Sequence, residues 1–315
     1  MSLQYPSFTP TYHNDQYPAI DPTQEALSCS GKTVFITGGG RGIGKHIAIA
    51  FAKAHAKSIV LLGRAKSSLD ETASEIRSIG DGKTDVFAVT ADFTVEEDVR
   101  KAMEAAVQHL GGKAPDILVN NAGGMSGVGK LIDVNIDEFM RAFDVNVRGP
   151  LLVAQAFMRA SRDTTPSMPK TLINVGSGAS HLPYAPGAAS YAASKLTASK
   201  ITEHIHHENP TWQVFNMHPG VVDTDLARAA GRKADDTAEL SSGFAVWLAA
   251  SPDAKEFNGC FLWAGWDVNE LLERKAEIQS KDLLTLTLKG WGEGMNVQEM
   301  KAKAASTFWD ADKQK

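Results

Sequence analysis

A glycine-rich turn between an apolar run and a helix-like stretch most restricts the folds open to this chain. The apolar residues Val34–Thr37 lead into the turn, and Gly38, Gly42 and Gly44 follow in a Gly-x-x-x-Gly-x-Gly spacing. An amphipathic pattern begins directly after them and runs to Ala54. When a strand leads through a turn into the N-terminus of a helix, the backbone N–H groups there can bind a pyrophosphate. The turn therefore predicts a dinucleotide-binding unit of an α/β fold, against the alternative of a tight turn without a ligand.

Seven short apolar runs, separated by stretches with apolar residues at helical spacing, predict the rest of the fold. The runs are Thr33–Ile36, Ser58–Leu62, Asp85–Val89, Asp116–Val119, Thr171–Val175, Gln213–Met217 and Cys260–Trp263. They are β-branched or aliphatic and mostly do not alternate with polar residues, as in strands that are covered on both faces. We therefore expect an α/β protein with a single-domain Rossmann fold, whose doubly wound seven-stranded parallel sheet has helices on both faces.

The sequence predicts one domain with two flanking segments. Residues 1–30 contain four prolines and little periodic hydrophobicity, so we expect an extended N-terminal arm there. Residues 31–268 carry all the predicted strands, without an internal repeat or a clear linker. Residues 269–315 begin with a charged, helix-forming stretch, and we expect this C-terminal extension to pack on the same domain.

Composition argues against several classes of partner and site. The chain has 32 lysines and arginines against 37 aspartates and glutamates, so nucleic acid is not expected as a main partner. Two distant cysteines, Cys29 and Cys260, are too few for a disulfide scaffold or a zinc knuckle, and we expect no metal. No apolar stretch approaches the roughly 20 residues of a membrane span, and no secretory signal pattern is present. We therefore expect a cytoplasmic protein that does not bind a membrane.

The end of the second predicted strand indicates which coenzyme the turn binds. Binding of NAD usually requires a carboxylate about 20 residues beyond the glycines, where it bonds the ribose 2′-hydroxyl. Here that position contains Leu62-Gly63-Arg64, and the nearest acid is Asp70. Arg41, inside the glycine turn, is a second candidate for binding a 2′-phosphate, because guanidinium groups suit phosphate oxygens. These residues favour NADP(H), unless both arginines are merely solvated.

A Tyr-x-x-x-Lys pair follows a serine at a predicted strand end. Tyr191 and Lys195 lie four residues apart in a helix-favouring stretch, which places them on one face. A tyrosine has a pKa of about 10, and a neighbouring ammonium lowers that pKa towards the range useful for proton transfer. Ser177 follows the run Thr171–Val175, at the end where α/β sheets hold their sites. A lone Tyr-x-x-x-Lys usually marks a surface helix, but this combination indicates acid–base catalysis.

Taken together, these motifs resemble those of the short-chain dehydrogenase/reductase family over residues 32–267. The matching motifs are Thr37-Gly38-x-x-x-Gly42-Ile43-Gly44, Asp92, Asn120-Asn121-Ala122-Gly123, Asn146, Ser177, Tyr191-x-x-x-Lys195 and Pro219-Gly220-x-x-x-Thr224. One departure is Gly176, where many members have a second serine, and it affects no catalytic group. The flanking segments resemble those of fungal members.

The resemblance implies a role for four catalytic residues. Tyr191 would be the general acid that protonates the carbonyl oxygen during reduction. Lys195 would lower the pKa of Tyr191 and bind the nicotinamide ribose. Ser177 would hydrogen-bond the substrate oxygen, and Asn146 would hold a water that links Lys195 to solvent.

A larger set of residues is expected at the coenzyme. In the family pattern Asp92 contacts the adenine, and the segment from Pro219 to Thr224 brackets the nicotinamide. The predicted coenzyme-binding residues are Gly38, Gly40, Arg41, Gly42, Ile43, Gly44, Arg64, Asp92, Asn121, Ala122, Gly123, Tyr191, Lys195, Pro219, Gly220, Val222 and Thr224. Residues 225–236 correspond to the family's mobile substrate loop, or else form an ordinary surface connection.

The sequence thus predicts an NADPH-dependent oxidoreductase that reduces a ketone or aldehyde to an alcohol, reversibly. Two alternatives remain open, an NAD-dependent alcohol dehydrogenase of the same fold and a non-catalytic dinucleotide-binding regulatory protein. The substrate would be a small carbonyl or alcohol compound, and the fungal-type flanks suggest specialised metabolism. The family also implies a homo-dimer or homo-tetramer.

Overall fold

A seven-stranded parallel sheet in the order β3-β2-β1-β4-β5-β6-β7 forms the centre of the computed structural model. The structure describes residues 7–79, 82–162, 169–183, 186–231 and 233–289. Its strands are β1 (Thr33–Thr37), β2 (Ser58–Gly63), β3 (Asp85–Thr90), β4 (Ile117–Asn120), β5 (Thr171–Val175), β6 (Gln213–His218) and β7 (Phe261–Trp263). Each overlaps one predicted run, which confirms the predicted fold class.

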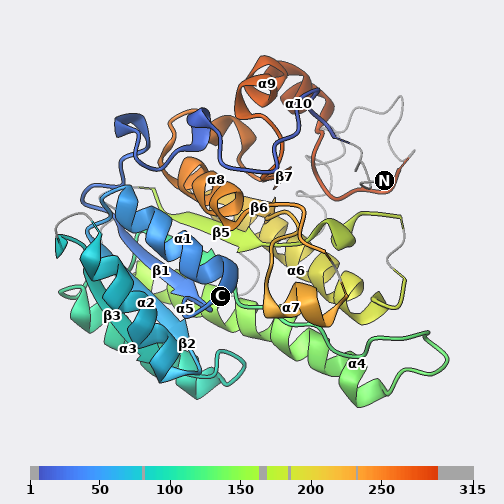
Figure 1. Ribbon diagram of the computed structural model, residues 1–315, viewed down its shortest axis with the longest axis horizontal. Coiled ribbons are helices and arrows are strands. Elements are labelled where there is room, and N and C mark those ends of the chain that lie inside the picture. The colour runs from blue at the N-terminus through green and yellow to red at the C-terminus, as the bar shows by residue number, and fades with distance from the viewer. Residues whose placement is uncertain (1–6, 80–81, 163–168, 184–185, 232, 290–315) are drawn as a thin grey trace, which may run out of the picture.

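Helices cover both faces of the sheet (Figure 1). One face carries α1, α2 and α8, and the other carries α3, α5 and α6. The helices are α1 (Gly42–Lys53), α2 (Lys66–Ser78), α3 (Glu96–His109), α4 (Ile136–Phe143), α5 (Gly149–Arg162), α6 (Ala189–Glu208), α7 (Asp225–Ala229), α8 (Ala238–Ala250), α9 (Val268–Glu273) and α10 (Lys275–Lys281). Short 3-10 turns are η1 (Pro18–Ile20), η2 (Glu25–Leu27), η5 (Gly178–Ser180) and η6 (Ala254–Phe257), and η4 (Asp144–Arg148) is a π-helical turn.

The strands have apolar residues on both faces because each face has its own core. Val34 and Ile36 of β1 belong to the cluster that includes α1 and α8, whereas Phe35 belongs to the one that includes α3 and α5. Successive residues of a strand point to opposite faces, so a strand buried on both sides has no polar alternation. Burial of one such side chain contributes about 1.5–3 kcal/mol.

All seven strands point the same way, so their carboxyl ends lie at one edge. Chain order reverses at β1, which pairs with β2 on one side and with β4 on the other. Ligands of open α/β sheets bind outside the carboxyl ends at such a reversal. The fold therefore brings together the segments that follow β1, β4, β5 and β6, and these segments carry the motifs identified from the sequence.

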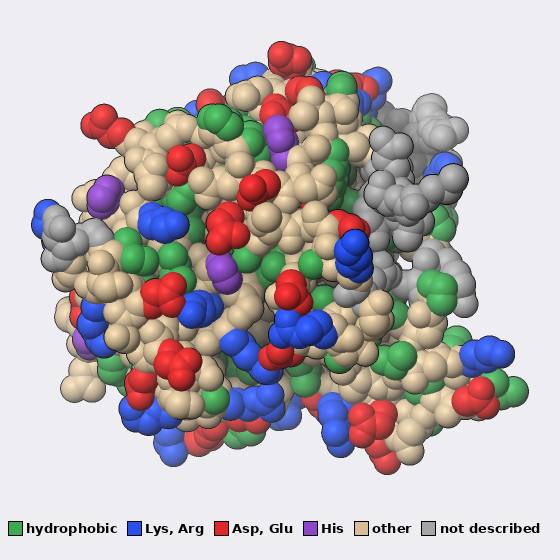
Figure 2. Space-filling view, in the orientation of Figure 1, with side chains coloured by type: hydrophobic (Ala, Val, Ile, Leu, Met, Phe, Trp, Pro, Cys, Tyr) green, Lys and Arg blue, Asp and Glu red, His purple; other side chains and the backbone are tan. Residues whose placement is uncertain are grey.

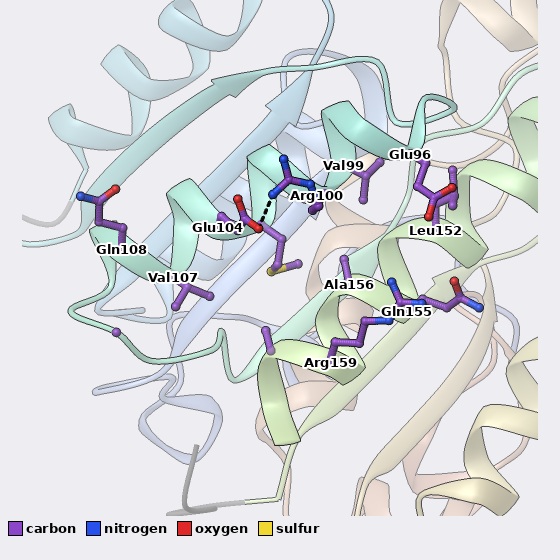
Figure 3. A pocket seen from close by; sticks show the side chains of 13 residues that line it. Glu96, Val99, Arg100, Glu104, Val107, Gln108, Leu152, Gln155, Ala156 and Arg159 are labelled. Carbon is purple, nitrogen blue, oxygen red and sulfur yellow. Dashed lines mark hydrogen bonds and ion pairs between the residues drawn. The ribbon is translucent and has the colours of Figure 1, made fainter. Parts of the chain in front are cut away.

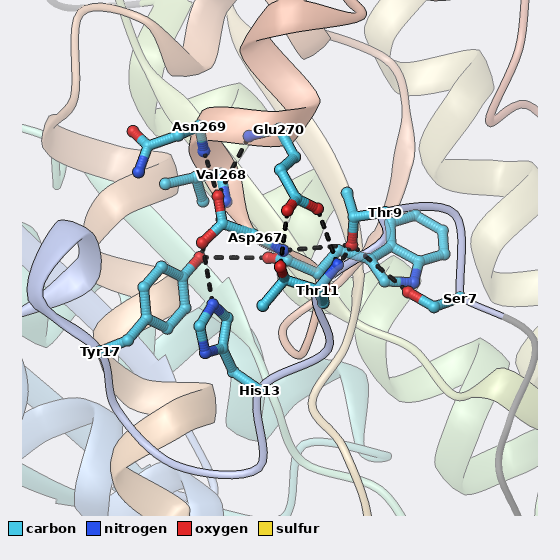
Figure 4. A network of polar contacts seen from close by, with 10 residues as sticks. Ser7, Thr9, Thr11, His13, Tyr17, Asp267, Val268, Asn269 and Glu270 are labelled. Atoms are coloured by element: carbon cyan, nitrogen blue, oxygen red, sulfur yellow. Dashed lines mark hydrogen bonds and ion pairs between the residues drawn. The ribbon is translucent and has the colours of Figure 1, made fainter.

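From Ser7 onward the N-terminal segment lies on the body of the protein, beside α8 and α9 (Figures 1 and 4). Tyr12 forms an antiparallel bridge with Trp266, and the Tyr17 hydroxyl donates to the Trp266 carbonyl at 3.1 Å. The predicted arm comprises residues 1–30, of which the first six lie outside the described residues.

The C-terminal segment contacts β7, one of the two edge strands of the sheet. After α10, the Leu284 carbonyl accepts from the Phe261 N–H of β7 at 2.7 Å. The next turn is tied to α6, because the Leu286 N–H donates to Glu203 Oε1 at 2.8 Å. The bond to Phe261 pairs a backbone N–H of the edge strand that would otherwise be unpaired, and the bond to Glu203 holds the segment beside α6. Of the predicted extension 269–315, residues 290–315 lie outside the described residues.

The surface carries charges of both signs. On the face shown in Figure 2, acidic and basic side chains are interspersed rather than gathered into one patch of a single sign. Within the described residues, no helix is long and apolar enough to cross a membrane.

Candidate active site

The turn after β1 is so close to its neighbours that two of its glycines are required. A Cβ on Gly44 would lie 2.3 Å from the Gly38 carbonyl oxygen. Gly38 has a φ of +69°, in the left-handed region that favours glycine. Thr37 Oγ1 accepts from the N–H groups of Asn121 and Ala122 at 3.0 Å each, which ties the turn to the end of β4. The start of α1 is thereby held at the carboxyl edge of the sheet.

This start of α1 fits the pyrophosphate of a dinucleotide. The N-cap of α1 is Arg41, and over the described ranges no side chain caps the helix. The first N–H groups of a helix have no intrahelical partner, and the helix dipole adds partial positive charge there. A Cβ at Gly44 would also lie 2.4 Å from Asn121 Nδ2, so only glycine lets the turn pack this closely against the start of α1. The residues present therefore suit a dinucleotide coenzyme.

The other predicted residues of the turn line its two sides. Gly40 faces α2, where a Cβ would lie 3.1 Å from Ser68 Cβ. Gly42 faces the segment after β6, where a Cβ would lie 3.3 Å from Thr224 Cγ2. Ile43 follows in the first turn of α1 and packs against the core.

The buried Lys195 and Asn146 meet beside the end of β4. A Cβ on Gly123 would lie 3.1 Å from both Lys195 Nζ and Asn146 Oδ1. Lys195 Nζ donates to the Val175 carbonyl at the end of β5, at 2.8 Å. Asn146 Nδ2 donates to the Gly124 carbonyl at 2.8 Å, and Asn146 Oδ1 accepts from the Gly124 N–H at 2.9 Å. Asn146 lies in the π-helical turn η4, a type of turn that occurs frequently at functional sites.

Tyr191 and Ser177 lie at the same edge. Tyr191 is half-buried on α6, one turn before Lys195, and its carbonyl accepts from Ser194 Oγ at 2.9 Å. Ser194 Oγ in turn accepts from Asn146 Nδ2 at 3.0 Å. Ser177 follows β5, and its Oγ accepts from the Ala179 N–H at 3.2 Å as the N-cap of η5. The fold thus brings the four predicted catalytic residues to one region.

Burial changes the acidity of the lysine. Removal of the Lys195 amine from water lowers its pKa from 10.5 to about 8. Burial disfavours a charged form that is not paired with an opposite charge. The amine is therefore mostly protonated at neutral pH and loses its proton within one or two pH units above it.

The two arginines predicted to bind a 2′-phosphate have acidic neighbours. Arg41 pairs with Asp225 of α7 at 2.5 Å, and both side chains are exposed. Arg64 follows β2 and is exposed. The pKa of Asp92 is lowered by hydrogen bonds from Thr94 and, to a smaller extent, by the charge of Arg64. Arg41 therefore lies in the glycine turn and Arg64 near Asp92, and both side chains are exposed.

The segment after β6 also reaches the glycine turn. Pro219 follows directly on β6, Gly220 has a φ of +89°, and Val222 is buried. Thr224 Oγ1 caps α7 by accepting from the Ala227 N–H at 3.1 Å. The predicted nicotinamide-binding residues therefore lie opposite the start of α1.

Comparison with known proteins agrees with this geometry. A family model described as short chain dehydrogenase matches residues 32–235, more than half of the chain. The chain belongs to the short-chain dehydrogenase/reductase family. Among curated relatives, the Short chain dehydrogenase mpl6 of Monascus purpureus is 34% identical over 284 residues, which cover 88% of this chain and 94% of that protein. The Short chain dehydrogenase tazN of Aspergillus terreus is 33% identical over 303 residues, which cover 90% of this chain but 63% of that protein.

Solved structures of similar proteins contain nicotinamide coenzymes. A blue fluorescent protein from a metagenomic library, in complex with NADPH, has a TM-score of 0.66 and 29% identity, covering 75% of this chain and 99% of that chain. A 3-ketoacyl-(acyl-carrier-protein) reductase from Brucella melitensis, complexed with NADH, has a TM-score of 0.66 and 32% identity, covering 75% of this chain and 97% of that chain. As a short-chain dehydrogenase/reductase, this chain belongs to a family of oxidoreductases that bind NAD(P)(H), and the family implies a small-molecule substrate.

Several groups at the site of this short-chain dehydrogenase/reductase escaped the sequence analysis. Ser194, inside the Tyr-x-x-x-Lys motif, bridges Tyr191 and Asn146. His181, after Ser177, accepts from Trp263 Nε1 at 3.0 Å, and burial lowers the pKa of its ring. No local pattern marks these residues, since each depends on a contact with another element.

A separate hollow of about 570 Å³ lies between α3 and α5, away from these residues (Figure 3). The residues that line it include the apolar Val99, Met103 and Leu152 and the basic Arg100 and Arg159. It contains none of the predicted site residues of this short-chain dehydrogenase/reductase. Within the described residues, no group of three or more histidine, cysteine or acidic side chains is placed to hold a metal ion.

Proposed function

We propose that this protein is an NADPH-dependent reductase that converts a ketone or aldehyde to an alcohol, reversibly. The observation that carries the proposal is the placement of the buried Lys195 amine. It lies beside Asn146, donates to the Val175 carbonyl at the end of β5, and is one helical turn from Tyr191. A buried amine next to a tyrosine has a clear use in proton transfer and costs stability otherwise.

The proposed chemistry divides between the coenzyme and the chain. When bound, the coenzyme supplies the hydride that reduces the carbonyl carbon. Tyr191 donates its phenolic proton to the carbonyl oxygen as negative charge develops there. The Ser177 hydroxyl donates a hydrogen bond to the same oxygen. The ammonium of Lys195 stabilises the phenolate that Tyr191 leaves, which makes the tyrosine a stronger acid.

Asn146 completes the proposed proton path. Its amide nitrogen is occupied by Gly124 and Ser194, while its oxygen accepts one bond from Gly124 and has a second lone pair. We assign that lone pair to a water that passes protons between Lys195 and solvent. The hydrogen bonds to Gly124 and Ser194 support this role, because they fix the amide without using the whole of its oxygen.

A pH profile tests this assignment. Lys195 is protonated below its pKa of about 8 and neutral above it. Reduction consumes a proton supplied through this path, so kcat/KM for reduction should fall about tenfold per pH unit above pH 8. Oxidation of the product alcohol releases a proton, so its rate should rise with pH and level off there. A reduction rate that stays constant to about pH 10 would contradict the role of Lys195.

The preference for NADPH rests on charge at the adenosine end. β2 ends in Gly63, and Arg64 follows where a carboxylate would bind the 2′-hydroxyl of NAD. With Arg41 in the turn, two guanidinium groups are available for a 2′-phosphate.

Substitution of these arginines gives a direct test. We expect Arg41→Ala and Arg64→Ala each to weaken NADPH binding about tenfold, since one charge-assisted hydrogen bond contributes about 1.5–3 kcal/mol. NADH lacks the phosphate, so its dissociation constant should change less than about threefold. The measurement is a calorimetric titration with each coenzyme, and Arg100→Ala on α3 is the matched control. An equal loss for both coenzymes would remove the phosphate-binding role.

Two observations favour a second candidate, an NAD-dependent alcohol dehydrogenase. Asp225 pairs with Arg41 and competes with a phosphate for it. A relative of 32% identity was solved with NADH. The titrations above separate the two candidates. A non-catalytic dinucleotide-binding protein would have no use for the buried Lys195 beside Tyr191, so we do not favour that alternative.

The setting of the reaction is proposed on weaker similarities. The alignments with Monascus and Aspergillus dehydrogenases extend beyond the residues of the family match, and on this similarity we propose a role in fungal specialised metabolism. Buried thiols at Cys29 and Cys260 suit a reducing compartment such as the cytoplasm. Ile136 and Met140 of α4 and Leu196 of α6 are exposed, and we propose that they pack against a second copy in a homo-dimer or homo-tetramer.

A further inference from the structure

The segment that leaves β6 is closed into a loop by one buried carboxylate. Asp236 Oδ2 accepts from the Val221 N–H at 2.6 Å, and the Asp236 N–H donates to the Val221 carbonyl at 3.1 Å. Val222 and Asp236 also form a parallel bridge. A Cβ on Gly220 would lie 2.6 Å from Asp236 Oδ2, so the carboxylate fits directly against the backbone. Asp236 therefore fixes the backbone of Gly220–Val222.

The second oxygen of this carboxylate is held by the N-terminal segment. Asn14 Nδ2 donates to Asp236 Oδ1 at 2.7 Å. The Asn14 carbonyl accepts from the Thr237 N–H at 2.9 Å, and Thr237 Oγ1 donates to Asp15 at 2.7 Å. Asn14 and Asp236 are 222 positions apart in the sequence, and the two residues after Asn14 and Asp236, namely Asp15 and Thr237, bond as well.

The N-terminal segment is anchored independently of the loop. The His13 N–H donates to the Gly265 carbonyl at 2.7 Å, and the His13 ring bonds the Asp267 carboxylate at 2.8 Å. The Thr11 hydroxyl and N–H both donate to Glu270, at 2.6 and 2.8 Å (Figure 4). These contacts join the segment to the start of α9. Asn14 therefore extends from a fixed support.

Because Asp236 is buried, its carboxylate depends on its hydrogen-bond partners for stability. The Asp236 side chain is 7% exposed, and a buried carboxylate requires a hydrogen bond at each oxygen. Loss of water around the group raises its pKa, a direction that the bonds from Val221 and Asn14 oppose. Asn14 itself is exposed, so a substitution there changes the pair without creating a cavity.

We propose that Asn14 and Asp236 are a positioning pair for the active site. Through Asp236 the N-terminal segment sets the backbone of Gly220–Val222, part of the segment from Pro219 to Thr224 that the family resemblance places at the nicotinamide. This inference rests on the proposed function for its catalytic consequence but not for the structural coupling. The N-terminal segment then contributes to the coenzyme site by positioning the backbone that follows β6.

An exchange of the two side chains tests the pair. Asn14→Asp places a second carboxylate next to that of Asp236, and the two like charges repel at this distance. Adding Asp236→Asn restores one donor and one acceptor, because the new amide can accept from Val221 and donate to the carboxylate introduced at position 14. Gln16→Glu, two residues along the segment, is the control for an added negative charge.

Two readouts separate the coupling from the chemistry. In the coenzyme-free protein, Asn14→Asp should speed amide hydrogen exchange in residues 220–224 about tenfold, and the double variant should return it to within about threefold of wild type. The same variants should weaken and restore NADPH binding in parallel, with the thermal midpoint of Asn14→Asp close to that of Gln16→Glu. Unchanged exchange in Asn14→Asp, or no recovery in the double variant, would overturn the pair. If wild type binds neither NADPH nor NADH, the proposed function fails, and the exchange data alone decide the coupling.

Discussion

Replacing Tyr191 with phenylalanine is expected to lower kcat for carbonyl reduction by about 10²–10⁴-fold, the usual contribution of a positioned general acid. Phenylalanine keeps the ring on α6 and removes only the hydroxyl, so the proposed general acid is lost while the hydrogen bond from Ser177 to the substrate oxygen remains. Binding of NADPH should change little, because the glycine turn and the start of α1 are untouched. The measurement is kcat for the variant together with its dissociation constant for NADPH.

A matched control removes another hydroxyl from the same helix. Thr202 of α6 is buried, and its Oγ1 donates within the helix, to the Ala198 carbonyl at 2.9 Å. Thr202→Val should therefore leave kcat within about twofold of wild type. Full turnover by Tyr191→Phe would remove tyrosine from the mechanism.

Replacing Gly44 with alanine is expected to weaken coenzyme binding by about 10–100-fold, because overpacking costs about 1–3 kcal/mol and each 1.4 kcal/mol is tenfold. The new Cβ would lie 2.3 Å from the Gly38 carbonyl oxygen, and a backbone atom cannot rotate away as a side chain does. Relief requires the turn and the start of α1 to separate, which moves the N–H groups proposed to bind the pyrophosphate. Calorimetric titration with NADPH measures the loss.

The control for general destabilisation is Gly259→Ala, before β7 and at the opposite edge of the sheet. There a Cβ would lie 2.7 Å from the His206 ring, and the φ of +86° adds backbone strain. This variant should unfold at a lower temperature yet keep its affinity for NADPH. If both variants lose the same affinity, the effect of Gly44→Ala comes from stability and not from the coenzyme site.

Much of the fold follows from local pattern. A strand buried on both faces has a continuous apolar run, and most predicted runs begin at the first residue of the observed strand. The exceptions are the runs predicted from Asp116 and Cys260, whose strands begin one residue later, at Ile117 and Phe261. The glycine turn is also visible in the local sequence, since a side chain at Gly44 would clash with the Gly38 carbonyl oxygen. The order of the strands is not local, because it depends on which segments pair across the sheet, and the sequence patterns do not predict it.

The contacts that complete the site are not local. Asn14 meets Asp236, and Leu284 meets Phe261, between segments whose sequences have no shared period or spacing. A buried aspartate in a polar loop has the same local signature as a solvated one. The low pKa of the Lys195 amine likewise follows from burial between α6 and the end of β5, which the Tyr-x-x-x-Lys spacing alone does not reveal.

The most direct test of the central claim is a titration of the wild-type protein with NADPH and with NADH, followed by tryptophan fluorescence and confirmed by calorimetry. It requires no knowledge of the substrate. The proposed site predicts binding of both, with NADPH at least about tenfold tighter because of its 2′-phosphate. Tighter binding of NADH would contradict the assignment of Arg41 and Arg64, and binding of neither would contradict the proposed redox function.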